Sequence, residues 1–246
     1  MATPWRVYGA SAIGKGHIDA GLPCQDSFAT TFDNERLAAV VCDGAGSASR
    51  SELGASECAN VICTFLTTAA SVPAISVDQT FIEQAVKAAR ARIEIRALEA
   101  SLPTRELACT LVGVILFSHG GYLFHVGDGM AVVEFPDGSS ILSMPENGEY
   151  SNETFFVTSD DWQPHLRITP FVGQASCICL MSDGAMPFAI NREKSGLFGP
   201  FINPVRTYLS TVTESEGSEA LKATLADERT WSITSDDKTL LVVLPL

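Results

Sequence analysis

The chain of 246 residues carries 16 Lys and Arg against 29 Asp and Glu, which gives a formal net charge of −13 at pH 7. Hydrophobic residues make up 46% of the chain and charged residues only 18%, which excludes an intrinsically disordered polypeptide and supplies enough apolar side chains for a buried core. The acidic charge and the lack of a basic run interleaved with aromatic residues argue against nucleic acid as a partner.

Residues 1–6 lack the basic start and the apolar run of a secretory signal. No segment reaches the ~18 consecutive apolar residues that a membrane-spanning helix needs, so we expect no membrane association. The cysteines that stand in apolar stretches are typical of small core residues, and they are Cys42, Cys58, Cys63 and Cys109. Cys177 and Cys179 have no second pair with which to form a zinc site. This cysteine usage predicts a cytoplasmic protein.

The first half of the chain is predicted to contain two strands, at residues 5–11 and 37–42, followed by two amphipathic helices. Apolar residues recur at helical spacing between Ser51 and Leu66, and Ser51 suits the start of that helix. The second helix is predicted over residues 78–100, where an apolar face alternates with a charged one. Two helices therefore separate the early strands from the strands that follow.

The second half is predicted to be rich in strands. Four successive strands are expected at residues 107–117, 122–126, 130–135 and 140–142, and we interpret them as an antiparallel meander. The remaining elements are a strand at 177–181, helical patterns at 200–211 and 218–226, and a final strand at 239–244. Because residues 145–165 are polar and strand signals resume directly after them, we interpret them as a surface excursion within one domain that spans residues 1–246.

Several aspartates share one local context, because each stands at the end of a predicted strand or in a tight turn beside one. They are Asp43, Asp128, Asp183 and Asp236, with Asp26 as a fifth candidate. Carboxylates that converge on one edge of a fold repel one another and raise each other's pKa unless divalent cations offset the charge. Oxygen ligands favour Mg²⁺ or Mn²⁺ over zinc or copper. A single Asp-Gly pair is most often an ordinary turn, so the prediction of a metal site depends on the whole set.

Five short motifs contain these residues. In chain order they are Gln25-Asp26, Val41-Cys42-Asp43-Gly44-Ala45-Gly46, Gly127-Asp128-Gly129, Met181-Ser182-Asp183-Gly184 and Ser235-Asp236-Asp237-Lys238-Thr239. Their order and separation resemble the metal-dependent serine/threonine phosphatases of the protein phosphatase 2C type (PP2C, PPM), and most of all a bacterial branch of that family. The resemblance implies an α+β fold, a β-sandwich of two antiparallel sheets flanked by helical pairs, with a metal centre at one end.

The resemblance also implies a set of metal ligands, which by position are Asp26, Asp43, Gly44, Asp128, Asp183 and Asp236. Asp43 would bridge two Mn²⁺ or Mg²⁺ ions, and the carbonyl of Gly44 would bind one of them. Asp183 and Asp236 would complete the other ion, and Asp26 would act directly or through water. Asp128, together with Asp183, matches the place of a third and weaker metal. The implied reaction is attack of a metal-bridging hydroxide on phosphoserine or phosphothreonine, with Asp43 and Asp183 at its centre.

Two positions depart from the family pattern. Gly21 stands where many members carry an Arg that holds the substrate phosphate, and Ala45 stands where several carry a His. We consider His17, Lys15 and Arg50 as replacements, with His17 as a cation or proton donor over the metal centre. The alternatives are an exposed loop histidine at position 17 and a solvated residue at position 50.

The leading hypothesis is therefore an active phosphoprotein phosphatase. Two alternatives stay open, a catalytically weak relative that binds phosphoprotein partners as a regulatory module and an enzyme for small phosphate esters. We expect a monomer whose partners are phosphorylated proteins, including a dedicated Ser/Thr kinase, and we expect neither nucleic acid nor membrane as a partner. The acidic residues of the 145–165 stretch, which are Glu146, Glu149, Glu153, Asp160 and Asp161, would suit basic phosphopeptides if that stretch faces the substrate.

Overall fold

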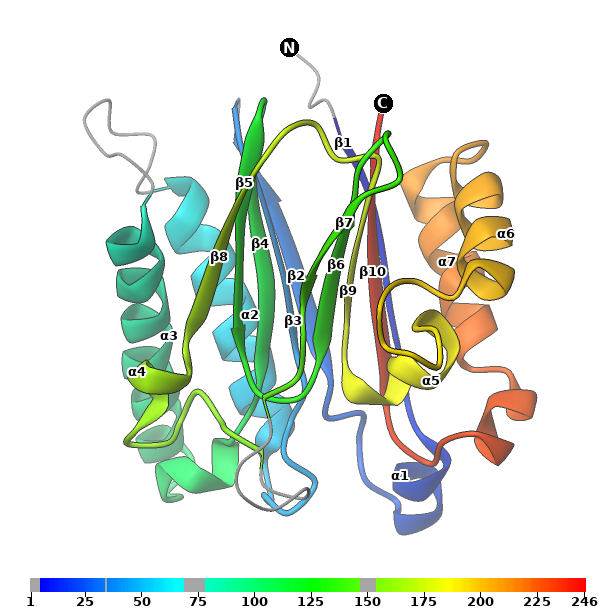
Figure 1. The fold of residues 1–246 in the computed structure, drawn as a ribbon. Coiled ribbons are helices and arrows are strands. Elements are labelled where there is room, and N and C mark those ends of the chain that lie inside the picture. The colour runs from blue at the N-terminus through cyan, green and yellow to red at the C-terminus, as the bar shows by residue number, and fades with distance from the viewer. Residues whose placement is uncertain (1–4, 34, 69–77, 147–153) are drawn as a thin grey trace.

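The computed structural model describes residues 5–33, 35–68, 78–146 and 154–246. Within these residues two five-stranded antiparallel sheets pack face to face, and helices cover the outer face of each (Figure 1). The layers therefore run helix, sheet, sheet, helix. This arrangement confirms the α+β sandwich expected from the sequence.

The first sheet, called here the β3 sheet, has the strand order β2 (Ser27–Phe32), β3 (Leu37–Cys42), β4 (Leu111–Phe117), β5 (Gly120–Val126) and β8 (Arg167–Val172). Helices α2 (Ser51–Thr68) and α3 (Gln79–Glu99) pack on its outer face. Every side chain of β3 is buried because the strand is covered on both faces: Ala38, Val40 and Cys42 pack toward the helices, and the residues between them pack toward the other sheet.

The second sheet, called here the β10 sheet, has the strand order β1 (Trp5–Ala12), β10 (Lys238–Pro245), β9 (Cys177–Met181), β6 (Met130–Glu134) and β7 (Ser140–Ser143). Helices α6 (Gly199–Leu209) and α7 (Glu214–Leu225) cover its outer face. The buried hydroxyl of Tyr8 donates a 2.6 Å hydrogen bond to the carbonyl of Leu209, which fixes β1 against the end of α6.

The shorter elements of the described residues are α1 (Lys15–Ala20), α4 (Trp162–His165), α5 (Met186–Ala189) and 3₁₀ helices at Thr104–Leu107, Asp183–Ala185 and Glu228–Ser232. No helix was predicted from the sequence at α1, where position 17 was considered as an exposed loop histidine. Helix α1 ends at Gly21, which adopts a left-handed conformation with φ of 66°.

The expected meander over the four central strands is wrong at its middle. Strand β5 belongs to the β3 sheet and β6 to the β10 sheet, so the chain crosses from one sheet to the other through Gly127, Asp128 and Gly129. Gly127 has φ of 109°, which lets the backbone turn away from the first sheet. Because both strands are buried on both faces, their apolar pattern could not indicate which sheet each joins.

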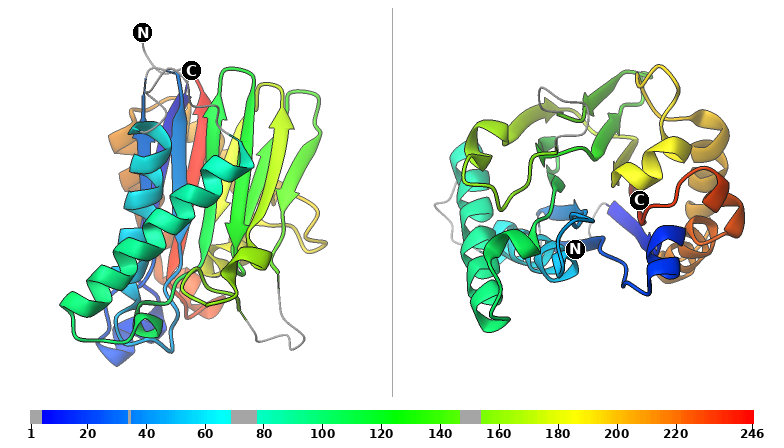
Figure 2. Two further views of the ribbon diagram at one scale, coloured as in Figure 1. Left: turned by 90° about the vertical axis from the view of Figure 1, so that its left-hand side faces the viewer. Right: turned by 90° about the horizontal axis from the view of Figure 1, so that it is seen from below.

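The strand ends that carry the predicted aspartates meet at one end of the sandwich. Ser27 pairs with Cys42, and Leu111 pairs with Val126, so the ends of β3 and β5 lie beside the starts of β2 and β4. In the other sheet Met181, the last residue of β9, pairs with Leu240 near the start of β10. This end lies opposite the start of β1 and the end of β10, and the right-hand view of Figure 2 looks onto it.

Among the described residues no helix is both long and apolar enough to cross a membrane. The cysteines, all of them in the described part of the chain, are free thiols, and the four that were predicted to lie in the core are buried. The N-terminal residues 1–4, which entered the argument on secretory signals, lie outside the described residues, as do Glu149 and Glu153 of the acidic stretch.

Candidate metal centre

A cavity of about 160 Å³ lies where the two sheets meet at this end of the molecule. Its polar lining includes Asp43, which follows β3, Asp128 from the crossover between the sheets, and Asp183 and Asp236 from the ends of β9 and β10. Asp43, Asp128 and Asp183 each offer one carboxylate oxygen, and these three atoms lie within 4.8 Å of one another. The structure thus brings together carboxylates that lie far apart in the sequence.

The backbone around Asp43 is fixed by the strand beside it. The amide of Asp43 donates to Oγ1 of Thr110 (3.1 Å), and the amide of Thr110 donates to the carbonyl of Asp43 (2.8 Å). The next bond in this ladder joins the amide of Ala45 to the carbonyl of Ala108 (2.9 Å). Neither backbone bond uses the carbonyl of Gly44, a residue that lines the cavity, so this oxygen remains available as a ligand.

Asp26 is buried and is not among the residues that line this cavity. Its Oδ2 atom accepts hydrogen bonds from Oγ of Ser182 and Oγ1 of Thr239, each 2.7 Å long. The amide of Thr239 also donates to Oγ of Ser182 (2.9 Å). Asp26 therefore ties the β3 sheet to β9 and β10, which agrees with a role through water or through other ligands more than with direct coordination.

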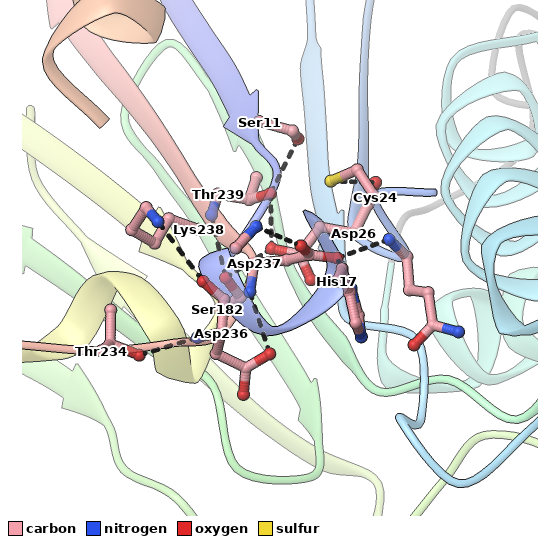
Figure 3. Close-up of polar contacts among 12 residues, drawn as sticks. Ser11, His17, Cys24, Asp26, Ser182, Thr234, Asp236, Asp237, Lys238 and Thr239 are labelled. Carbon is pink, nitrogen blue, oxygen red and sulfur yellow. Dashed lines mark hydrogen bonds and ion pairs between the residues drawn. The ribbon is translucent and has the colours of Figure 1, made fainter. Parts of the chain in front are cut away.

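Asp237 is a functional candidate that the sequence argument missed. Its buried carboxylate accepts from the amide of Gly14 (2.6 Å) and the amide of Gln25 (2.6 Å), and its Oδ2 lies 2.8 Å from Nδ1 of His17 (Figure 3). The signal was present as the Asp236-Asp237 doublet, of which only the first member was singled out. His17, a residue of helix α1, is thereby held beside Asp237. It is not part of the cavity lining.

Two further contacts orient the acidic side chains. Oγ1 of Thr154 donates a 2.7 Å hydrogen bond to Oδ2 of Asp128. Gly184 packs so closely against the carbonyl oxygen of Asp237 that a Cβ atom at position 184 would collide with it. A glycine after Asp183 is therefore required for the start of β10 to approach the end of β9, and this approach sets Asp236 beside Asp183.

The electrostatics of the cluster are unfavourable without cations. Burial raises the pKa of Asp43 well above its usual range, and the carboxylates of Asp26 and Asp183 raise it further. Burial, followed by the charges of Asp236 and Asp128, raises the pKa of Asp183 to about 6. Burial also raises the pKa of Asp26 to about 7, although the hydroxyls that donate to it act in the opposite direction. Ionisation of this set at neutral pH needs positive charge nearby.

The residues present fit divalent metal ions. Oδ1 of Asp26 and Oδ1 of Asp183 are buried and have no hydrogen-bond partner in the part of the chain that the structure describes. Buried carboxylate oxygens without a donor are costly to ionise unless a cation faces them. The donors at this site are all oxygen atoms, which suits hard ions such as Mg²⁺ and Mn²⁺.

The three suggested replacements for the missing phosphate-binding Arg already have carboxylate partners. Lys15 is paired with Asp19 one turn along α1, and Nε of Arg50 lies 2.6 Å from Oε1 of Glu52. His17 is held by Asp237 as described above. Gly21 and Ala45 supply no charge, so the described residues immediately around the cavity offer no unpaired cation at the positions suggested by the sequence.

Comparisons with known proteins agree with this architecture. Residues 13–226 match the family described as protein phosphatase 2C. Serine/threonine-protein phosphatase 3 of Escherichia coli (strain K12) is 31% identical over 248 residues, which cover 98% of this chain and 98% of that protein.

Two solved structures share the fold at low sequence identity. The catalytic domain of the serine/threonine protein phosphatase PstP, in complex with two manganese ions, is 16% identical with a TM-score of 0.62 and covers 97% of this chain and 98% of that one. RsbX in complex with magnesium is 15% identical with a TM-score of 0.60 and covers 100% of this chain and 98% of that one.

Proposed function

Because the chain belongs to the protein phosphatase 2C family and is a metal-dependent protein serine/threonine phosphatase, we propose that it hydrolyses phosphoserine and phosphothreonine at the cavity that Asp43 lines. The observation that carries this assignment is the convergence of three carboxylate oxygens within 4.8 Å, two of them from side chains whose pKa values are raised by burial and mutual repulsion. The regulatory-module alternative is not favoured by the family and its relatives.

We propose that two Mn²⁺ or Mg²⁺ ions bind there and that a third binds more weakly. Asp43 would face both principal ions, with the carbonyl of Gly44 on one and Asp183 and Asp236 on the other. Asp128 and Asp183 would hold the third. Bound divalent ions supply charge that polarises a phosphoryl group and activates water. The protein's own contribution is to fix the ligand geometry, and Thr110 does so at the backbone of Asp43.

We propose that Asp26 acts through a water molecule rather than as a direct metal ligand. Its Oδ2 is engaged by two hydroxyls, whereas its Oδ1 has no donor among the described residues. A carboxylate held in this way can accept a hydrogen bond from a water that itself faces an ion. Loss of Asp26 is therefore expected to weaken metal binding by loosening the ends of β9 and β10 as well.

His17 remains the proposed proton donor to the leaving serine or threonine oxygen. Asp237 holds Nδ1 of its ring at 2.8 Å, which leaves Nε2 as the nitrogen that would face a substrate. A cytoplasmic location, a monomeric state and a dedicated partner kinase stay predictions from the sequence and its resemblance.

The test is phosphate release from a phosphothreonine peptide by metal-stripped protein, titrated first with Mn²⁺ and then with Mg²⁺. We expect no turnover without metal and saturable turnover with either ion. Metal binding without turnover, or turnover that survives chelation, would contradict the proposal.

A further inference from the structure

A second cavity, of about 480 Å³, adjoins the metal centre and shares Asp128 and Asp183 with it. Its apolar lining comes from helix α5 and the residue that follows it, through Met186, Pro187 and Ile190. A groove that begins at the proposed reaction site and is lined by α5 is placed to receive the residues on one side of a phosphorylated residue.

The far rim of this groove is a tight turn that presents two cations, Arg192 and Lys194. The side chain of Asn191 closes the turn, because its Oδ1 accepts from the amide of Ser195 (2.9 Å), and the amide of Lys194 donates to the carbonyl of Asn191 (3.0 Å). The amide of Asn191 donates in turn to the carbonyl of Gly196 (3.0 Å). Lys194 has φ of 52°, a left-handed conformation that side chains other than glycine seldom adopt. These contacts fix the backbone of the turn from which both exposed cations extend.

These cations differ from the others near the site in their partners. Neither Arg192 nor Lys194 has a carboxylate within 4.0 Å in the described residues, whereas Lys15, His17 and Arg50 are each paired with one. In a chain of net charge −13, two neighbouring cations without such partners stand out beside an acidic centre.

We propose that this groove binds the residues that flank the phosphorylated serine or threonine and that Arg192 and Lys194 select acidic side chains there. The inference rests on the proposed function, because it takes the phosphate to lie at the metal centre. Met186 and Ile190 offer an apolar surface for the aliphatic part of the same segment. The occupant is therefore an acidic stretch of a phosphoprotein substrate.

This assignment reverses the preference for basic peptides that the acidic 145–165 stretch suggested. Within that stretch Glu146 is already engaged, since its Oε1 lies 3.3 Å from Nδ1 of His165 and its Oε2 lies 3.6 Å from Nε of Arg167. Its charge is therefore largely offset inside the protein. Beyond Asp128 and Asp183, the charged residues that line the groove are the two cations of the turn, because Glu193, which is exposed between them, is not part of the lining.

The experiment compares four substrates: p-nitrophenyl phosphate and three phosphothreonine nonapeptides whose flanking residues are Glu, Ala or Lys. The variant is the double charge reversal Arg192→Glu with Lys194→Glu. We expect the wild-type protein to favour the Glu peptide and the double variant to favour the Lys peptide. Each cation is expected to change kcat/KM about fivefold at low salt, mainly through KM, and the effect should shrink as salt is added.

Two controls separate docking from damage. Lys222→Glu makes one such charge reversal on an exposed face of α7 and should leave the peptide order unchanged. Arg192→Gln with Lys194→Asn removes both charges while Asn tolerates the left-handed backbone, and it should abolish the preference without reversing it. Activity on p-nitrophenyl phosphate should stay within about twofold in all variants, because this small substrate does not reach the rim.

A wild-type preference for the Lys peptide, or a Glu preference that the double variant keeps, would overturn the inference. An equal loss on p-nitrophenyl phosphate would overturn it as well, because the cations would then act on the transferred phosphate itself. Failure of the wild-type protein to hydrolyse any of the four substrates with any divalent metal would instead contradict the proposed function.

Discussion

The hydroxyl of Ser182 donates a 2.7 Å hydrogen bond to the carboxylate of Asp26 at the point where the two sheets of the sandwich meet. Ser182 follows β9 in the β10 sheet, and Asp26 precedes β2 in the β3 sheet. Both side chains are buried. The contact therefore couples the packing of the sheets to the position of Asp183, the residue next to Ser182.

Replacement of Ser182 by alanine removes one of the two hydroxyl donors to a buried carboxylate. We expect Ser182→Ala to lower the free energy of unfolding by about 1–3 kcal/mol and to weaken Mn²⁺ binding. Urea denaturation and calorimetric titration with Mn²⁺ measure the two effects. Ser140→Ala, at an exposed position at the start of β7, is the control and should change neither quantity. Equal behaviour of the two variants would show that the Ser182 contact contributes nothing.

The carboxylate cluster predicts how the stability of the metal-free protein depends on pH. The folded-state pKa of Asp183 is raised from 3.8 to about 6, so between these values the folded state binds more protons than the unfolded state. Its contribution to stability is complete below pH 4 and is lost as the pH rises through 6. We therefore expect Asp183→Asn to raise the free energy of unfolding of the metal-free protein by about 1–3 kcal/mol more at pH 7.5 than at pH 4.

The measurement is the difference in thermal stability between wild-type and Asp183→Asn protein at the two pH values, both without metal. The comparison between the two proteins is needed because buried His125, whose pKa is lowered to about 3, makes the folded state more stable as the pH rises, opposite to Asp183. This contribution is the same in both proteins and cancels. If Asp183→Asn stabilised the metal-free protein equally at both pH values, the prediction would be contradicted. At pH 7.5, saturating Mn²⁺ should strongly stabilise only the wild-type protein.

The close approach of β9 and β10 predicts a specific effect at Gly184. A Cβ atom there would collide with the carbonyl oxygen of Asp237, so Gly184→Ala must push the start of β10 and Asp236 away from Asp183. We expect Mn²⁺ affinity to fall about tenfold or more. Gly46→Ala is a matched control, because Gly46 also lines the cavity and a Cβ atom there has no neighbour within 4 Å. If both variants bound Mn²⁺ equally, the packing argument would fail.

The proposed role of His17 makes a prediction about leaving groups. Threonine oxygen is a poor leaving group and needs a proton, whereas p-nitrophenolate does not. We expect His17→Gln to lower kcat for the phosphothreonine peptide about 100-fold and to leave p-nitrophenyl phosphate hydrolysis and Mn²⁺ affinity unchanged. Asp237→Asn should affect both substrates, because Asp237 also holds the amides of Gly14 and Gln25. Equal losses on both substrates in His17→Gln would assign His17 a positioning role instead.

Much of the site could be predicted because its signals are local. Asp43 and Asp183 each follow a buried strand and precede a glycine, and this pattern is visible in a few consecutive residues. The fold class followed from the order of the motifs. Strand ends in a sandwich then bring such residues together without any further information.

The rest depends on contacts that the sequence does not display. His17 and Asp237 are 220 residues apart, so their pairing could not be foreseen. The partners of Lys15 and Arg50 are only four and two residues away, and these local pairs were overlooked. The crossover at Asp128 was missed because β5 and β6 are buried on both faces and their apolar patterns look alike. Arg192 and Lys194 occur in an ordinary polar loop, and only the groove beside them makes them candidates.

The most direct test of the central claim is phosphate release from a phosphothreonine peptide during a Mn²⁺ titration of wild-type, Asp43→Asn and Asp137→Asn proteins. Asp137 is an exposed aspartate in the β6–β7 hairpin and controls for the charge change. We predict that Asp137→Asn matches the wild-type protein and that Asp43→Asn, folded by circular dichroism, loses about a thousandfold in kcat/KM and binds Mn²⁺ more weakly. Wild-type turnover and Mn²⁺ affinity in Asp43→Asn would contradict the claim that this carboxylate cluster is the metal centre.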